Sequence, residues 1–262
     1  MSGKTLRVRV LFVVLALVGA ACATSVSSGD TTADANSDAT GTMPIDLVPG
    51  TVDVRTLVMA DGTHITFGLI LPDGFDPLLS YPTLLALPPG GQDIDLTISV
   101  AESIYLSEAI SRGWVVITPA APNGTLFFQG SEKYIPEFLD ALDWIEPEDG
   151  LVHIAGVSNG GRSTFRIAAL SPTLFASVVV YPGFPGSDAD KEALPDLAHL
   201  PFTMFVGSQD AGWLREMEIT HDALVSLGAD VVLDIREGEG HVIASLSDGK
   251  DIFDALDRMR RS

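Results

Sequence analysis

Apolar runs alternate with helix-patterned segments along most of this chain, and this alternation limits the fold more than any other feature. Strands are predicted at 81–88, 114–120, 151–157, 175–181, 202–207 and 230–237. The middle ones are short and nearly continuously apolar, which is typical of strands buried on both faces of a parallel sheet. Helices are predicted between and after them, at 95–112, 131–146, 159–171, 211–228 and 249–261.

Two further strands are predicted before this alternation begins. Segments 52–59 and 64–72 flank Asp61-Gly62, a turn sequence that favours an antiparallel hairpin. Alternating strands and helices then imply an α/β fold with a doubly wound, mostly parallel sheet of about eight strands. The stretch 182–201 is too short for a lid of several helices, so we expect an open site and no large lid domain.

A targeting segment is predicted at the N-terminus. Lys4, Arg7 and Arg9 precede an apolar run at 10–23. This run is shorter than a typical membrane span and fits the core of a signal peptide. We therefore expect residues 1–22 to be a signal peptide and the protein to be exported.

The end of this segment reads VGAAC and resembles a bacterial lipobox, which predicts that Cys22 is lipid-modified. Cleavage after Ala23 would instead release a soluble secreted protein, and both possibilities remain open. Residues 23–44 are rich in small and polar residues, which predicts a disordered tether. The folded domain is expected at 45–262, with membrane attachment only through the lipid.

Composition excludes several classes of function. The chain of 262 residues has 35 acidic and 15 basic residues and a formal net charge of −20, which argues against a nucleic acid partner. No basic cluster indicates a phosphate-rich or polyanionic substrate. Cys22 is the single cysteine, so neither an intrachain disulfide nor a thiol nucleophile in the domain is possible.

The stretch GVSNG, residues 156–160, lies where a predicted buried strand passes into a predicted helix. This G-x-S-x-G pattern in this context predicts a nucleophile elbow, in which Ser158 occupies a strained turn. An idle serine in a glycine-rich turn is the alternative.

A serine hydroxyl needs a general base, and His241 is the candidate among five histidines. It follows the strand at 230–237 in a short loop, at the edge where parallel strands place binding groups. The other four are expected to be structural or solvated: His64, His153, His199 and His221.

The base in turn needs an orienting carboxylate, for which Asp210 is predicted. It lies three residues beyond the strand at 202–207. The alternatives are Asp188 and Asp190, which follow the preceding strand in a polar stretch expected to be solvated surface. The chain order of Ser158, Asp210 and His241 is that of an α/β-hydrolase.

An oxyanion hole needs backbone N–H groups near the nucleophile. One is expected from Asn159. Pro88 and Pro89 have no N–H, so the second is expected from Gly90, with Gly91 as the next candidate. Aromatic residues in strand-end loops are expected to line an apolar acyl or aryl pocket: Phe127, Phe128, Phe184 and Trp213.

Taken together, these residues resemble the α/β-hydrolase superfamily over residues 50–262. The stretches LPDGFDPLLSYPTLLALPPGGQD and GVSNGGRST look like the esterase branch. That branch includes dienelactone hydrolases, feruloyl and acetyl esterases, polyester depolymerases and single-domain relatives of prolyl oligopeptidases. One departure is Pro88-Pro89, where relatives usually carry His-Gly.

The resemblance implies a serine hydrolase that forms an acyl-enzyme on a small-molecule or polymer ester, without cofactor or metal. Two other functions remain open. Prolyl-oligopeptidase-like peptidases share the elbow, although the chain has no room for their additional gating domain. A non-catalytic binding lipoprotein on the same fold is the other, and it would have no need for all three of Ser158, Asp210 and His241.

Overall fold

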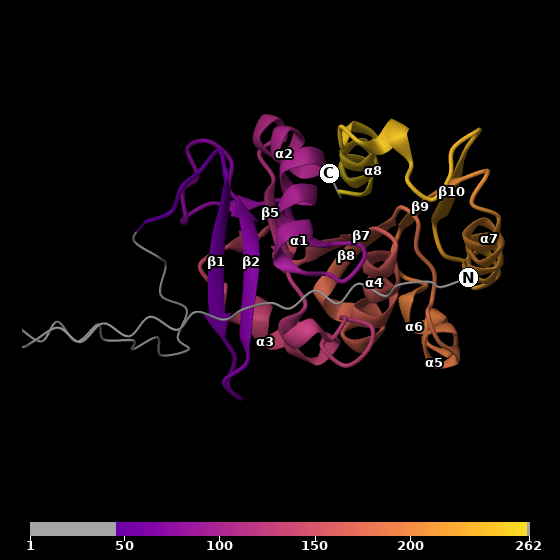
Figure 1. Cartoon of the computed structure of the whole chain (residues 1–262), viewed down its shortest axis with the longest axis horizontal. Coiled ribbons are helices and arrows are strands. Elements are labelled where there is room, and N and C mark those ends of the chain that lie inside the picture. Colours follow the sequence, from indigo (N-terminus) through magenta and orange to yellow (C-terminus); the bar gives the residue numbers. More distant parts are fainter. Residues whose placement is uncertain (1–45, 261–262) are drawn as a thin grey trace, which may run out of the picture. The chain divides into compact units, whose positions relative to one another are not determined.

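The computed structural model describes residues 46–260, so the predictions for the signal peptide, Cys22 and the tether lie outside the described residues. Within this range an eight-stranded sheet runs in the order β1-β2-β5-β4-β7-β8-β9-β10 (Figure 1). Its strands are β1 (Val52–Val58), β2 (His64–Ile70), β4 (Thr83–Leu87), β5 (Val115–Pro119), β7 (Val152–Gly156), β8 (Phe175–Val180), β9 (Phe202–Gly207) and β10 (Val231–Arg236).

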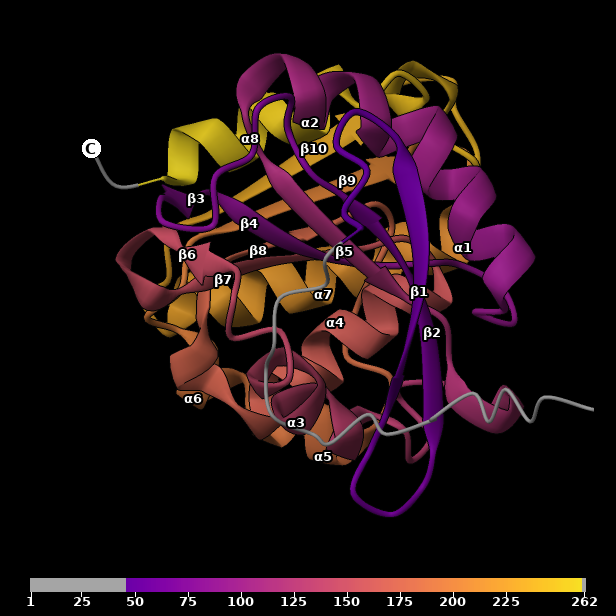
Figure 2. The ribbon, with the colours of Figure 1, turned by 90° about the vertical axis from the view of Figure 1, so that its left-hand side faces the viewer.

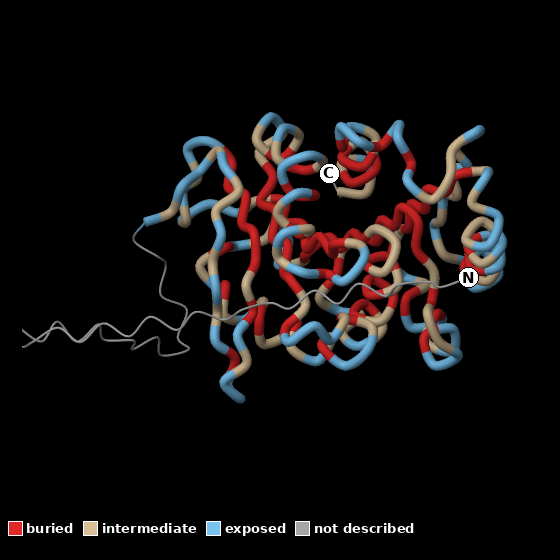
Figure 3. Tube along the Cα trace, viewed as in Figure 1, coloured by how far each residue is buried: buried red, intermediate tan, exposed pale blue. Residues whose placement is uncertain are grey.

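The strand directions confirm the predicted doubly wound, mostly parallel sheet. β2 pairs antiparallel with both β1 and β5, and every other neighbouring pair is parallel. All residues of β4, β5, β7 and β9 are buried, as expected of apolar strands covered on both faces (Figure 3). A short parallel pair that the sequence did not indicate joins β3 (Ser80–Tyr81) to β6 (Glu146–Pro147).

Helices cover both faces of the sheet (Figure 2). One face packs against α1 (Ile94–Val100), a π-helical turn (Ala101–Tyr105), α2 (Leu106–Arg112) and α8 (Lys250–Met259). The other packs against α3 (Ile135–Asp140), α4 (Asn159–Leu170), α6 (Leu194–Leu197) and α7 (Ala211–Ser226), with α5 (Asp188–Glu192) beside α4. Short 3₁₀ turns occur at Pro122–Gly124, Glu132–Tyr134, Glu148–Gly150, Pro172–Leu174 and Ala244–Leu246.

Two predicted helices differ from expectation. The segment 95–112 is helical throughout but contains the π-helical turn, a feature common near functional sites. The ends of this helical segment are capped in the usual way. The Asp93 side chain accepts a hydrogen bond at the N-terminus, and Gly113 ends the segment in the left-handed conformation, with φ 74°. The segment 131–146 is an α-helix only over Ile135–Asp140, with a 3₁₀ turn before it, turns after it and Glu146 in β6.

The segment between β8 and β9 belongs to the core of the domain. It contains α5 and α6, which the sequence did not indicate, and Leu194 and Leu197 are buried against the sheet side occupied by α4. The apolar side chains of α6 are therefore used for packing.

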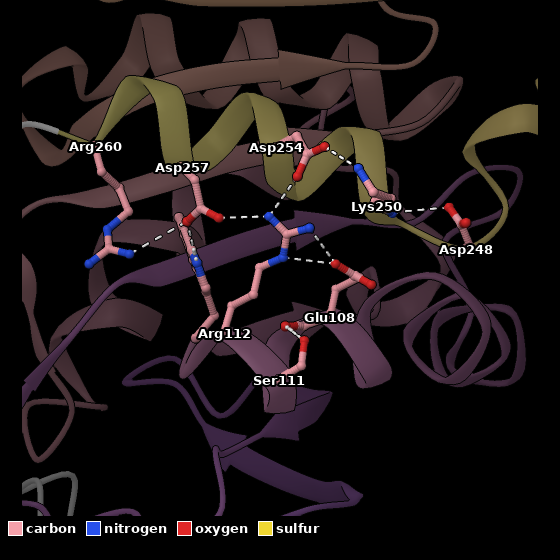
Figure 4. Close-up of polar contacts among 9 residues, drawn as sticks. Glu108, Ser111, Arg112, Asp248, Lys250, Asp254, Asp257 and Arg260 are labelled. Atoms are coloured by element: carbon pink, nitrogen blue, oxygen red, sulfur yellow. Dashed lines mark hydrogen bonds and ion pairs between the residues drawn. The ribbon is translucent and has the colours of Figure 1, made fainter.

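An ion-pair network joins α2 to α8 (Figure 4). The Arg112 guanidinium lies 2.6 Å from Glu108 on its own helix, and 2.8 and 2.7 Å from Asp254 and Asp257 on α8. Asp257 also accepts a hydrogen bond from the Trp114 indole at 3.1 Å. These contacts join α8 to α2 and Trp114, and α8 is the next α-helix after the loop carrying His241.

Candidate active site

Ser158 lies in a strained turn between β7 and α4. Its backbone has φ 57° and ψ −116°, in a region that residues other than glycine rarely adopt, and its N–H donates to the Pro182 carbonyl at 2.8 Å. α4 begins at the next residue. The strand, turn and helix expected of a nucleophile elbow are therefore present.

The glycines around Ser158 are required by close backbone contacts. A Cβ on Gly156 would lie 2.3 Å from the Gly160 carbonyl oxygen, and one on Gly160 would lie 2.1 Å from that of Leu87. A Cβ on Gly161 would lie 2.4 Å from the Pro182 oxygen. Since real carbon–oxygen contacts do not approach so closely, any side chain at these positions would push the elbow off the sheet.

The structure brings Ser158, His241 and Asp210 together at the carboxyl edge of the sheet. The Ser158 Oγ lies 2.8 Å from His241 Nε2, and His241 Nδ1 lies 2.6 Å from Asp210 Oδ2. With the Nδ1 proton donated to the carboxylate, Nε2 is left free to accept a proton from the serine. The Asp210 side chain is 13% exposed, whereas that of His241 is 40% exposed and accessible to a substrate.

The alternative acids lie elsewhere, and one of them differs from its prediction. Asp188 is exposed in the first turn of α5. Asp190 was expected on the solvated surface but is only 3% exposed, because Arg166 pairs with it at 2.7 Å and Ser187 donates to it at 2.8 Å. The expectation of a solvated Asp190 was therefore wrong.

The other histidines take no part in this constellation. His153 lies within β7, where its Nδ1 is 2.6 Å from the Ser177 hydroxyl. Burial lowers the pKa of His153 to about 4, which keeps the imidazole neutral at pH 7. His64 is exposed at the start of β2 and His221 lies on α7 beside Asp222.

Two backbone N–H groups near Ser158 are available to an oxyanion. Within residues 46–260, neither the Gly90 nor the Asn159 N–H donates to another protein group, and Asn159 is the first residue of α4. The Asn159 side-chain amide donates to the Gly90 carbonyl at 2.8 Å, which ties the two donor segments together. Gly90 has φ 58°, a conformation suited to glycine, and lines the same cavity as Ser158. Gly91 is not among the residues lining that cavity.

An apolar cavity of about 460 Å³ opens beside Ser158 and His241. Its walls come from the α1 segment with its π-helical turn, and from the loop that follows His241. They include Leu96, Val100, Ile104, Val157, Val242, Ile243 and Leu246.

None of the four predicted aromatic residues lines this cavity. Phe127 is fully buried in the core, so its assignment to a pocket was wrong. Phe128, Phe184 and Trp213 are half-buried and lie elsewhere around the site, with the Trp213 ring 4.7 Å from that of His241. Chain position placed all four after strand ends, although Trp213 lies in the first turn of α7, and it could not tell which direction each ring takes.

Comparison with known proteins supports the same architecture. No family model matches the sequence. A thermostable esterase is similar, with a TM-score of 0.63 and 17% identity, over 79% of this chain and 62% of that protein. An S-formylglutathione hydrolase from Agrobacterium tumefaciens has a TM-score of 0.62 and 17% identity, over 79% of this chain and 95% of that one. The chain has the α/β-hydrolase fold.

A third solved structure with this fold comes from Bacteroides ovatus and is assigned as a dipeptidyl aminopeptidase IV. It has a TM-score of 0.59 and 18% identity, over 79% of this chain but only 36% of its own length. The chain thus spans less than two thirds of the esterase and of the Bacteroides ovatus protein, but nearly all of the S-formylglutathione hydrolase.

In this α/β-hydrolase fold, Gln92 supports the loop that carries Gly90, a contribution that sequence reasoning missed. The side chain is fully buried, and its amide nitrogen lies 3.1 Å from both the Pro88 carbonyl and the Ser163 hydroxyl. Its amide oxygen accepts from the Phe127 N–H at 2.9 Å. Gln92 thereby links the loop containing Pro88-Pro89 to α4 and to the loop after β5. In the sequence, the only feature that could have indicated this contribution is the position of Gln92, a polar residue directly after Gly90-Gly91.

Within residues 46–260, no group of histidine, cysteine or acidic side chains is arranged to hold a metal ion. Over the same range, no helix has the length and apolar character needed to cross a membrane.

Proposed function

We propose that this protein is a serine hydrolase that cleaves carboxylic esters through an acyl-enzyme intermediate. The observation that carries the proposal is the pair of hydrogen bonds linking Ser158 to His241 at 2.8 Å and His241 to Asp210 at 2.6 Å. Nucleophile, base and orienting acid stand in the order that acyl transfer needs.

The steps follow from this geometry. His241 Nε2 removes the Ser158 proton while Oγ attacks the ester carbonyl, and the Gly90 and Asn159 N–H groups stabilise the developing oxyanion. The imidazolium then donates its proton to the departing alcohol, leaving the acyl group on Ser158. A water molecule, deprotonated by His241, attacks the acyl-enzyme and releases the acid.

The cavity supports an ester with an apolar group rather than a peptide. No acidic side chain is among the residues that line it, so it offers no partner for the N-terminal amino group of an aminopeptidase substrate. Its mostly apolar walls favour a hydrocarbon substituent, and each buried methylene stabilises binding by about 0.8 kcal/mol. The name of one similar structure, a thermostable esterase, supports the same class, whereas the protein from Bacteroides ovatus is the similar structure whose name supports a peptidase.

The test is turnover of p-nitrophenyl acetate, butyrate and hexanoate beside an aminoacyl-p-nitroanilide. We expect the esters to be hydrolysed, with kcat/KM rising from acetate to the longer acyl groups because the cavity buries them. Preferential cleavage of the anilide would identify a peptidase. Absence of turnover with every substrate would favour the non-catalytic binding function.

We further propose that the protein is exported and anchored through a lipid on Cys22. The charged start and the apolar run at 10–23 support this proposal. In a bacterial host, Cys22→Ser is expected to move the protein from the membrane fraction to the soluble fraction, because the acylated thiol is lost. Mass spectrometry of the mature wild-type protein checks the assignment. An unmodified chain beginning at Thr24 would show plain secretion instead.

A further inference from the structure

Arg162 lies one helical turn beyond Ser158 on α4, and its N–H donates to the Ser158 carbonyl at 3.1 Å. Side chains on a helix lean toward its N-terminus, so the guanidinium is directed toward the turn that carries the nucleophile. It lies 5.0 Å from the centre of the Phe128 ring and 5.4 Å from that of Phe184. Both rings belong to loops at the carboxyl edge of the sheet.

The charge of Arg162 is not neutralised by the domain. Within residues 46–260 no carboxylate lies within ion-pair distance of it, although the chain has a large excess of acidic residues. Its nearest hydrogen-bond acceptor is the Gly186 carbonyl, at 3.5 Å, and its Nε is buried without an acceptor. Arg166, one turn further along α4, shows the contrast, since it pairs with Asp190 at 2.7 Å. Within residues 46–260, only the N–H groups on the two terminal nitrogens that do not donate to Gly186 are left for a ligand, because Nε is buried.

A row of neighbouring aromatic rings connects the Arg162 guanidinium to His241, the candidate base. The Phe184 ring lies 4.8 Å from the Trp213 ring, and the Trp213 ring lies 4.7 Å from the His241 ring. We call Phe128, Arg162, Phe184 and Trp213 the cationic shelf. None of its members lines the apolar cavity beside Ser158. The site thus has two different neighbourhoods, one apolar and one cationic and aromatic.

We propose that Arg162 binds a carboxylate on the alcohol part of the substrate, so that the enzyme prefers esters of carboxylate-bearing aryl alcohols. The proposal rests on the proposed function. The imidazole must lie next to the departing oxygen, and the shelf begins at the imidazole ring. An aryl group there can stack on Trp213 and Phe184 while its carboxylate accepts two hydrogen bonds from the guanidinium. Because the net charge of the protein repels anions, a local unpaired cation is needed to hold one.

The test compares 4-carboxyphenyl butyrate with 4-carbamoylphenyl butyrate, which have nearly the same shape and differ in charge. In Arg162→Met, the ratio of kcat/KM for the charged ester to that for the neutral ester is expected to fall about ten- to a hundredfold, mainly through KM. Arg162→Lys should retain part of the preference. The ratio is measured within one sample, so partial unfolding of a variant does not affect it.

Arg258→Met is the control for the change in net charge, because it also removes one positive charge, from an exposed side chain on α8. It should leave the ratio at its wild-type value. An unchanged ratio in Arg162→Met, or an equal fall in Arg258→Met, would overturn the proposal.

A binding measurement keeps this test separate from catalysis. Saturation-transfer NMR with 4-hydroxybenzoate and 4-hydroxybenzamide reports affinity for the released alcohols without any turnover. Wild-type protein should bind the benzoate more tightly, and Arg162→Met should lose that difference. Failure of ester hydrolysis with this difference intact would contradict the proposed function alone, whereas equal binding of both compounds by wild-type protein would overturn the role of Arg162.

Discussion

Replacing Ser158 by alanine will lower ester turnover by at least about a thousandfold, the scale usual for loss of a triad nucleophile. Without Oγ there is no atom to accept the acyl group, and His241 can only assist direct attack by water. The measurement is kcat for p-nitrophenyl butyrate, with the fold checked by circular dichroism. Because Ser158 has φ 57°, the substitution keeps a strained backbone, so Tm should be measured alongside.

Covalent labelling provides an independent check of the same assignment. A fluorophosphonate should modify wild-type protein at Ser158 and leave Ser158→Ala unlabelled. Ser111→Ala is a suitable control, because that hydroxyl is exposed on α2 and donates only to the Glu108 carbonyl. Near-normal turnover by Ser158→Ala would show that Ser158 is an idle turn residue and that another group carries any hydrolysis.

Asp210→Asn is expected to lower kcat by about two to four orders of magnitude while the domain stays folded. The amide of the asparagine can donate a hydrogen bond to His241 Nδ1. This favours the tautomer that carries its proton on Nε2, and a protonated Nε2 cannot accept the serine proton. The substitution also removes the charge that stabilises the imidazolium. Folding should survive, because Asp210 makes no side-chain cap to α7 and its carboxylate is engaged by His241 instead.

Asp188→Asn is the matched control for this substitution. Asp188 is exposed at the start of α5, so its variant should stay within a few-fold of wild type. Asp190→Asn is unsuitable as a control, because it would weaken the buried pair with Arg166 and lower stability. A collapse of activity in Asp188→Asn with normal activity in Asp210→Asn would refute the assignment of the acid.

Local sequence patterns were sufficient to predict the strands and the turn that position the site. The apolar runs of β4, β5, β7 and β9 are strands because their side chains must be buried on both faces of the sheet. The glycines of GVSNG indicated the turn at Ser158, since a residue in that conformation needs small neighbours. Strand order along the chain then predicted that Asp210 and His241 would reach the same edge.

The sequence by itself therefore determined which residues follow each strand end, including Ser158, Asp210 and His241. It comes from short-range periodicity together with the rule that parallel strands share one carboxyl edge. Chain position also predicted the N–H donors, because Asn159 directly follows Ser158 and Gly90 is the first residue after Pro88-Pro89 that has an N–H.

Only the tertiary structure decided which loop side chains face the site. Phe127 and Phe128 are adjacent in the sequence, yet Phe127 is in the core and Phe128 lies against Arg162. Asp190 and Gln92 are polar residues buried by partners far away in the chain, Arg166 and Ser163. The cavity walls come from segments near 100 and near 245, which meet only after the sheet has formed. Burial of a loop side chain depends on contacts between distant segments, and neither composition nor periodicity contains that information.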